Sequence, residues 1–173
     1  TGYEEAAAQG LMAGLNAGGV NVLDLEVASV PVTRVQARRP DAVAGITLRL
    51  AEDDAQSVTI RFFDTNGADI SEDTQRKIER LFNREDYRRV LPSEIGDIGF
   101  PPRAIEQYAV ALESVVDVEA IGSAGFKVVV DYSYGSTSFV MANVFSKLGA
   151  EVLAVNPFVS TQGVVEFDRE AHA

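Results

Sequence analysis

The sequence has 173 residues, 46% of them apolar, which is enough for one medium domain or a small domain with part of another. Asp and Glu outnumber Lys and Arg 26 to 15, and a net charge of −11 argues against nucleic acid and anionic membranes as partners. The absence of cysteine excludes disulfides and thiolate zinc sites, and the single histidine, His172, is expected to be a solvated tail residue. No apolar run approaches the roughly 20 residues of a membrane span and the N-terminus lacks the basic start of a signal peptide, so we expect a cytoplasmic protein.

The first forty residues predict helix, strand and helix. An alanine-rich helix is expected over residues 4–17, with Gly18 and Gly19 as its stop signal. A strand is expected over 20–25. A short helix is expected over 32–39, because the residue before a proline avoids helical geometry.

Two alternating segments follow and predict half-buried strands. Apolar and polar residues alternate over 45–50 and again over 58–62, and the acidic loop 51–57 joins them. Asn66 and Gly67 then form a strong tight-turn signal.

A helix is predicted to begin after Ser71, which would be its N-cap residue. The carboxylates of Glu72 and Asp73 in the first turn suit the positive end of the helix dipole. The helix should run to about residue 82 and bury one apolar face, formed by Ile78, Leu81 and Phe82.

A domain boundary is predicted at the end of the irregular stretch 92–102, which holds two glycines and three prolines. It divides the chain into residues 1–100 and 101–173. The second part opens with apolar residues at helical spacing, namely Ile105, Tyr108, Leu112 and Val115.

A β-α-β unit is predicted later in this second part. It comprises a buried strand over 127–131, a helix over 136–147 and a strand over 151–155, and the crossover should be right-handed. A further short strand is predicted over 163–167.

The segment between Gly45 and Phe63 resembles the α-D-phosphohexomutases, the phosphomannomutase and phosphoglucomutase family. Their first domain carries a strand and loop written roughly G-I-M-I-T-A-S-H-N-P, followed by Y-N-G-I-K-F-F. Here Gly45-Ile46 begins the matching stretch and Ile60-Arg61-Phe62-Phe63 ends it, without a gap.

The resemblance extends over nearly the whole chain. Residues 13–25 and 66–82 resemble the elements on either side of that loop, and 126–135 and 147–152 resemble the opening of the second domain. The implied fold is α/β. It comprises a phosphohexomutase-type domain over 1–100, with a mixed sheet between helices and without its first strand. A β-α-β fragment of a second similar domain would follow.

The matching loop lacks the residues that carry the family reaction, which passes a phosphoryl group between a serine and a hydroxyl of a sugar phosphate. The serine position falls on Ala51, and the three following positions fall on Glu52, Asp53 and Asp54. Ala51 has no nucleophilic oxygen, and three carboxylates would repel a phosphate. Only the lysine-like charge persists, as Arg61, the one substrate-binding candidate.

Two features of this loop could still support catalysis or metal binding. Ser57 could be a displaced nucleophile, although it falls on a tyrosine-like position and we expect no neighbouring base. The three acids could bind a hard cation, although such a loop is more often a solvated turn. The resemblance implies Mg²⁺, but the D-G-D-x-D-type run that would hold it does not occur between residues 99 and 173.

Two other clusters favour structural roles. Residues 134–138 join a strand to a helix N-terminus that could hold an anion, but helix capping is the simpler interpretation. A basic cluster on this acidic chain is typical of a solvated helix face paired with Glu85 and Asp86; it consists of Arg80, Arg84, Arg88 and Arg89.

The leading hypothesis is a phosphohexomutase-like module of carbohydrate and sugar-nucleotide metabolism without mutase activity of its own. It would act with the rest of a longer parent chain, such as a mannose-1-phosphate guanylyltransferase fusion, and could bind a sugar phosphate. The alternatives are a structural, regulatory or homo-oligomerisation domain, and an active mutase that uses Ser57.

Overall fold

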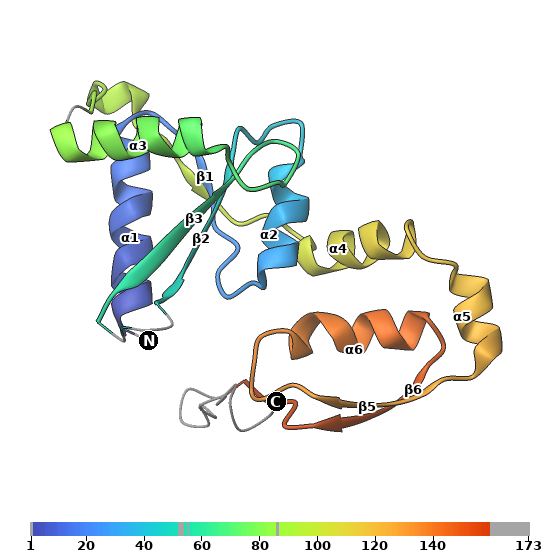
Figure 1. Cartoon of the computed structure of the whole chain (residues 1–173). Helices are drawn as coiled ribbons and strands as arrows, with labels where there is room; N and C mark the ends of the chain where they lie inside the picture. The colour runs from blue at the N-terminus through green and yellow to red at the C-terminus, as the bar shows by residue number, and fades with distance from the viewer. Residues whose placement is uncertain (1, 52–53, 55, 86, 160–173) are drawn as a thin grey trace. The chain divides into compact units, whose positions relative to one another are not determined.

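The computed structural model describes residues 2–51, 54, 56–85 and 87–159. These residues divide into two compact units (Figure 1). The first comprises residues 2–26 and 30–104, and the second comprises 27–29 and 105–159. The predicted strand 163–167 and His172 lie outside the described residues.

The first unit begins with helix α1 (Gly2–Ala17) and strand β1 (Val22–Leu23). As predicted, α1 ends at two glycines: Gly19 has a φ of +84°, a conformation that glycine adopts without strain. The predicted strand 20–25 is shorter in the structure. The Val20 N–H donates to the Leu15 carbonyl (3.0 Å) and so completes the helix end instead of joining a strand.

Helix α2 (Val30–Ala37) starts two residues earlier than predicted and contains Pro31 in its first turn. A proline is tolerated there because the N–H groups of the first turn have no partner within the helix. Val32 and Ala37 of α2 are almost completely buried, at 1% and 2% exposure, and belong to the core of this unit.

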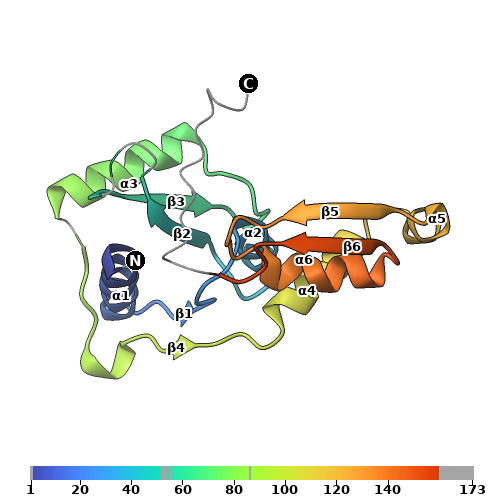
Figure 2. The same cartoon turned by 90° about the horizontal axis from the view of Figure 1, so that it is seen from below.

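Strands β2 (Gly45–Leu50) and β3 (Val58–Phe63) form the predicted antiparallel hairpin, with Gly45 opposite Phe63 and Leu50 opposite Val58. The start of the hairpin packs against α2. A Cβ on Gly45 would lie 2.8 Å from that of Ala37, so the glycine permits this approach. Helix α1 also contacts both strands and lies beside them in both views (Figures 1 and 2).

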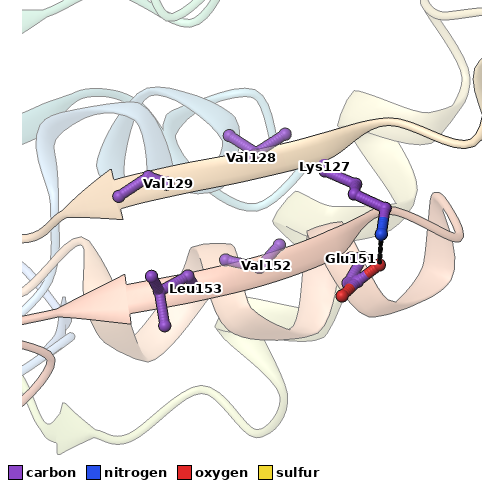
Figure 3. Close-up of a pocket in the computed structure, with 6 residues that line it drawn as sticks. All are labelled: Lys127, Val128, Val129, Glu151, Val152 and Leu153. Atoms are coloured by element: carbon purple, nitrogen blue, oxygen red, sulfur yellow. Dashed lines mark ion pairs between the residues drawn. The ribbon is translucent and has the colours of Figure 1, made fainter.

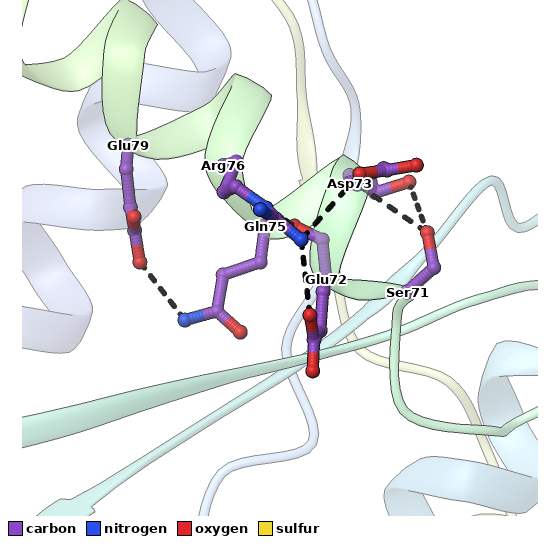
Figure 4. Close-up of polar contacts among 7 residues, drawn as sticks. Ser71, Glu72, Asp73, Gln75, Arg76 and Glu79 are labelled. Carbon is purple, nitrogen blue, oxygen red and sulfur yellow. Dashed lines mark hydrogen bonds and ion pairs between the residues drawn. The ribbon is translucent and has the colours of Figure 1, made fainter.

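The turn at Asn66-Gly67 and helix α3 (Glu72–Arg84) follow as predicted. The Ser71 hydroxyl accepts a hydrogen bond from the Thr74 N–H (3.3 Å), and charged residues pair along the exposed first turns (Figure 4). The predicted buried face is wrong for two of its three residues: Ile78 is half-buried, but Leu81 is 53% exposed and Phe82 is 79% exposed, because no described element covers them.

The predicted irregular stretch contains a 3-10 turn, η1 (Pro92–Glu94), and a short strand, β4 (Ile98–Gly99), that pairs in parallel with β1. A Cβ on Gly96 would lie 2.0 Å from the Val20 carbonyl oxygen. Only glycine allows the chain to approach this closely.

The second unit contains helices α4 (Ala104–Glu113) and α5 (Val118–Ala124) and then the predicted β-α-β arrangement. That arrangement consists of β5 (Lys127–Asp131), α6 (Ser138–Lys147) and β6 (Glu151–Val155), with β5 and β6 parallel. Helix α5 was not predicted from the sequence.

Helix α6 covers only one face of the β5–β6 pair (Figures 1 and 2). Val140 and Val144 of α6 are buried, at 3% and 0% exposure. The prediction that β5 is buried is wrong, because its residues alternate and Val129 is 68% exposed. The described strands form three two-stranded sheets, two parallel and one antiparallel, so the α/β class is confirmed.

Candidate functional site

The candidate site is the loop between β2 and β3, of which residues 51, 54, 56 and 57 are described. The Ala51 N–H donates to the Ser57 carbonyl (2.9 Å), and the Ser57 N–H donates to the Asp54 carbonyl (3.0 Å). These bonds extend the hairpin beyond Leu50 and Val58. Glu52 and Asp53 lie outside the described residues.

Asp54 is the centre of the described part of the loop. Its carboxylate accepts hydrogen bonds from the Ser57 hydroxyl (2.5 Å) and the Gln56 N–H (2.9 Å). These two bonds favour the charged form and hold the pKa of Asp54 below its ordinary value. Asp54 is therefore a carboxylate at neutral pH, exposed at the tip of the hairpin.

The expectation that Ser57 has no neighbouring base is wrong, because the Ser57 hydroxyl donates a hydrogen bond to the Asp54 carboxylate. Folding of the loop brings the two residues together. However, a carboxylate with a lowered pKa is a weak base, so it activates a hydroxyl poorly at neutral pH.

Arg61, the substrate-binding candidate, lies on β3 opposite Thr47 and is exposed. Alternation along the strands places Arg49 on the same face of the hairpin, two residues before the loop. Sequence reasoning missed Arg49, although the period-two pattern contains it. One face of the hairpin thus presents two guanidinium groups near an acidic tip.

Helix α1 contributes a side chain to the base of the loop. The Leu50 N–H donates to the Glu4 carboxylate (2.8 Å), so Glu4 ties the end of β2 to the first turn of α1. The partners are 46 positions apart in the sequence, and no local signal indicates this contact.

The side-chain cap expected from residues 134–138 is not formed at the start of α6. The N-cap residue Thr137 makes no capping bond, and the Ser138 hydroxyl instead donates to the Gly135 carbonyl (3.1 Å). Tyr132, which directly follows β5, is buried at 7% exposure. The basic cluster is exposed, but only Arg80 and Arg84 lie on α3, whereas Arg88 and Arg89 follow its end. Among the described residues no ion pair joins these arginines to Glu85, so the predicted pairing with Glu85 is wrong; Asp86 lies outside the described residues.

Two shallow hollows lie outside the loop. One lies beside β3 and the start of α3, and its lining includes Val43, Phe62, Ile70, Thr74 and Ile78. The other lies on the β5–β6 pair, where Lys127 and Glu151 form an exposed ion pair (3.1 Å) beside Val129 and Leu153 (Figure 3).

A metal centre is not formed by the part of the chain that the structure describes. Within it, no group of three or more His, Cys, Asp or Glu side chains could hold an ion. The Mg²⁺ that the resemblance implies therefore has no fitting ligand set among these residues. No helix among them is long and apolar enough to cross a membrane.

Comparison with known proteins places this hairpin in a family. A sequence model described as phosphoglucomutase/phosphomannomutase, alpha/beta/alpha domain I, matches residues 3–89. The match takes in α1, the hairpin with its loop, and α3. The chain belongs to the phosphoglucomutase/phosphomannomutase family, and the resemblance seen in the sequence is confirmed.

Similar proteins extend the match beyond that domain. A phosphoglucosamine mutase of Dictyoglomus thermophilum is 32% identical over 148 residues, which cover 84% of this chain and 32% of that protein. A phosphoglucomutase/phosphomannomutase of Thermococcus kodakarensis is 30% identical over 146 residues, 84% of this chain and 32% of that protein. The chain thus spans about a third of the length of these curated relatives.

A crystal structure shares the fold. It is that of a phosphoglucomutase/phosphomannomutase family protein from Burkholderia thailandensis, with a TM-score of 0.66 and 19% identity, covering 88% of this chain and 33% of that one.

Proposed function

We propose that this chain is a phosphohexomutase-type module of carbohydrate and sugar-nucleotide metabolism whose own hairpin loop cannot carry a phosphoryl group. One observation carries the proposal: the hairpin is formed in full register, and the residue at its expected serine position, Ala51, ends in a methyl group. The relatives are named as mutases of phosphorylated sugars, so the activity that we propose this loop has lost is phosphoryl transfer on such sugars.

The charge of the loop supports the same proposal. Transfer of a phosphoryl group requires a nucleophile and cations that neutralise the phosphoryl oxygens. Asp54 is instead held in its charged form by Ser57 and Gln56. A fixed carboxylate beside an incoming phosphate raises the energy of the bound state, and Glu52 and Asp53 add to the negative charge.

The decisive experiment transplants the loop into a complete enzyme. Residues 51–54 replace the serine-loop positions of the D. thermophilum phosphoglucosamine mutase, and kcat is measured. We expect a loss of at least about a thousandfold, because the nucleophile is gone. As the matched control, only residues 56–57 of the same loop are transplanted, and most of the activity should remain. Near-normal activity of the 51–54 transplant would refute the proposal.

A second experiment separates a binding module from a scaffold. The exposed apolar residues Val129 and Leu153, at 68% and 64% exposure, favour a structural or assembly role as the second candidate. The chain is titrated with mannose 1-phosphate and glucose 6-phosphate. Saturable binding that Arg61→Ala weakens and Arg80→Ala does not would establish binding at the hairpin and rule out a pure scaffold.

The third candidate, an active mutase that uses Ser57, is tested by intact mass. The chain is incubated with a hexose bisphosphate and Mg²⁺, and Ser57→Ala is the control. A stable phosphoryl group mapped to Ser57 would overturn the proposal. We further propose that the module belongs to a longer protein such as a mannose-1-phosphate guanylyltransferase fusion; the flanking sequence tests this.

A further inference from the structure

The turn between β3 and α3 holds the only Asn-Gly pair of the sequence, Asn66-Gly67. In a flexible chain, such a pair loses ammonia spontaneously, because glycine leaves the following backbone nitrogen unhindered. That nitrogen gives up its proton to hydroxide and attacks the Cγ of the asparagine. The bond from Cγ to the amide nitrogen breaks, and ammonia leaves with a proton from water. Water then opens the cyclic imide to aspartate or isoaspartate.

In the folded chain, the backbone nitrogen of Gly67, which is the nucleophile of this reaction, is not free to react. The Gly67 N–H donates to the Asp64 carbonyl (2.9 Å), so its proton is held in a backbone hydrogen bond. Gly67 is buried, although Asn66 beside it is exposed. The Asn66 N–H also donates to the Asp64 carboxylate (2.9 Å), which fixes the residue that would have to rotate into place.

Arg34, on helix α2, bonds two residues of this turn. Its guanidinium donates to the Gly67 carbonyl (2.8 Å) and to the Asp69 carboxylate (2.8 Å), and it lies 4.3 Å from the centre of the Phe63 ring. A Cβ on Gly67 would lie 2.4 Å from the Arg34 carbonyl oxygen. The turn is therefore clamped against α2 on both sides of Gly67.

We propose that Asn66 is a modification site that folding closes: it deamidates when the turn is open and is protected when Arg34 clamps it. Both products disfavour the closed turn. Isoaspartate adds one backbone atom between the residue 66 Cα and the Gly67 nitrogen, which shifts the Gly67 N–H away from the Asp64 carbonyl that it bonds in the closed turn (2.9 Å). Aspartate places a second carboxylate beside that of Asp64, which lies 3.4 Å from the Asn66 amide nitrogen. A chain modified while open therefore refolds poorly.

The test compares deamidation in the folded and unfolded full chain. The chain is kept at mildly alkaline pH with and without urea, and the mass gain at residue 66 is followed by peptide mapping. We expect the folded chain to react slower by on the order of tenfold or more, because the turn must first open. Isoaspartate at residue 66 should then collect in the fraction that fails to refold after urea is diluted. Equal rates, or isoaspartate spread equally over both fractions, would overturn the proposal.

Arg34→Lys tests the clamp, because lysine cannot donate to Gly67 and Asp69 together in the same geometry. In the folded state, shown by circular dichroism, its Asn66 should deamidate on the order of tenfold faster than in the wild type. Arg39→Lys is the matched control, since Arg39 also pairs with an aspartate and is 30% exposed against 31% for Arg34. An unchanged rate in folded Arg34→Lys would refute the clamp; if this variant is unfolded, the wild-type comparison decides.

Discussion

At the scale of single residues, the turn at 64–69 is specified by a glycine and an aspartate. Gly67 has a φ of +72° and lies against the backbone of α2, and the Asp64 carboxylate accepts the N–H groups of Asn66 (2.9 Å) and Ala68 (3.0 Å). Gly67 allows the backbone conformation of the turn and Asp64 bonds its N–H groups, so substitution of either residue should change the free energy of unfolding.

Gly67→Ala should lower the free energy of unfolding by about 1–3 kcal/mol, because alanine is strained at positive φ and its Cβ would meet the Arg34 carbonyl. Gly10→Ala is the matched control. A Cβ at residue 10 meets nothing within 4 Å, and alanine should stabilise the interior of α1 by about 0.5–1 kcal/mol. Urea unfolding of both variants measures the two changes in the free energy of unfolding. Changes of equal size and the same sign would contradict the special role of Gly67.

Asp64 should make the stability of the first unit depend on acidic pH. Hydrogen bonds from the N–H groups of Ala68 and then Asn66 lower the pKa of Asp64 in the folded state. Its contribution is therefore complete above the unfolded pKa of about 3.9 and is lost as the pH falls through the lower folded pKa.

Asp64→Asn should flatten the fall in stability below about pH 4 relative to the wild type. Chemical unfolding at a series of pH values measures this. The control is Asp97→Asn, which removes the charge of an exposed aspartate outside the turn, so that the comparison isolates the effect of the hydrogen bonds to Asp64. If Asp64→Asn retains the wild-type slope, the turn does not bind the charged form more tightly.

At the scale of elements, helix α3 begins at Ser71 because its hydroxyl satisfies the Thr74 N–H, which has no partner within the helix. The acidic residues Glu72 and Asp73 occupy the first turn and pair with Arg76 at 3.0 and 3.7 Å (Figure 4). These pairs are exposed, so each contributes little. The cap is the main local determinant of where the helix starts.

Ser71→Ala should destabilise α3 by about 1 kcal/mol. Ser123→Ala on α5 is the control: Ser123 is exposed within a helix, and no bond joins its hydroxyl to another described residue. Ser71→Asp should restore stability, since aspartate is also a good N-cap residue. Circular dichroism during urea unfolding measures all three variants, and a loss with Ser123→Ala as large as that with Ser71→Ala would contradict the capping role.

At the scale of the whole molecule, the net charge of −11 is the dominant electrostatic feature. The ion pairs described within the two units are exposed or half-buried, as with Lys147 and Glu113 (3.0 Å). Exposed pairs of this kind contribute little to stability, so their screening by salt costs little, whereas salt also screens the repulsion among the excess carboxylates, over a Debye length of about 10 Å at 0.1 M.

Raising NaCl from about 0.01 M to about 0.5 M should therefore raise the midpoint of thermal unfolding. Scanning calorimetry at the two salt concentrations measures the shift. A charge-reduced variant, Glu106→Gln with Glu119→Gln, should show a smaller rise. A fall in the midpoint with salt would mean that the ion pairs outweigh the net repulsion.

Local patterns in the sequence predicted much of this molecule. Alternation predicted β2 and β3 at their observed bounds, apart from one added residue, and the order of β5, α6 and β6 was correct. The Asn66-Gly67 turn and the Ser71 cap were also local signals. The motif spacing identified the loop that begins at Ala51, and the family match confirms the family.

Only the tertiary structure decided the contacts between distant residues. The bonds of Glu4 with Leu50 and of Arg34 with Gly67 join partners 46 and 33 residues apart, which no local pattern encodes. The neighbour of Ser57 depended on how the loop folds, and the exposure of Leu81, Phe82 and Val129 depended on what packs over them. A sequence fixes propensity and periodicity along the chain, whereas burial and pairing are decided by the rest of the fold.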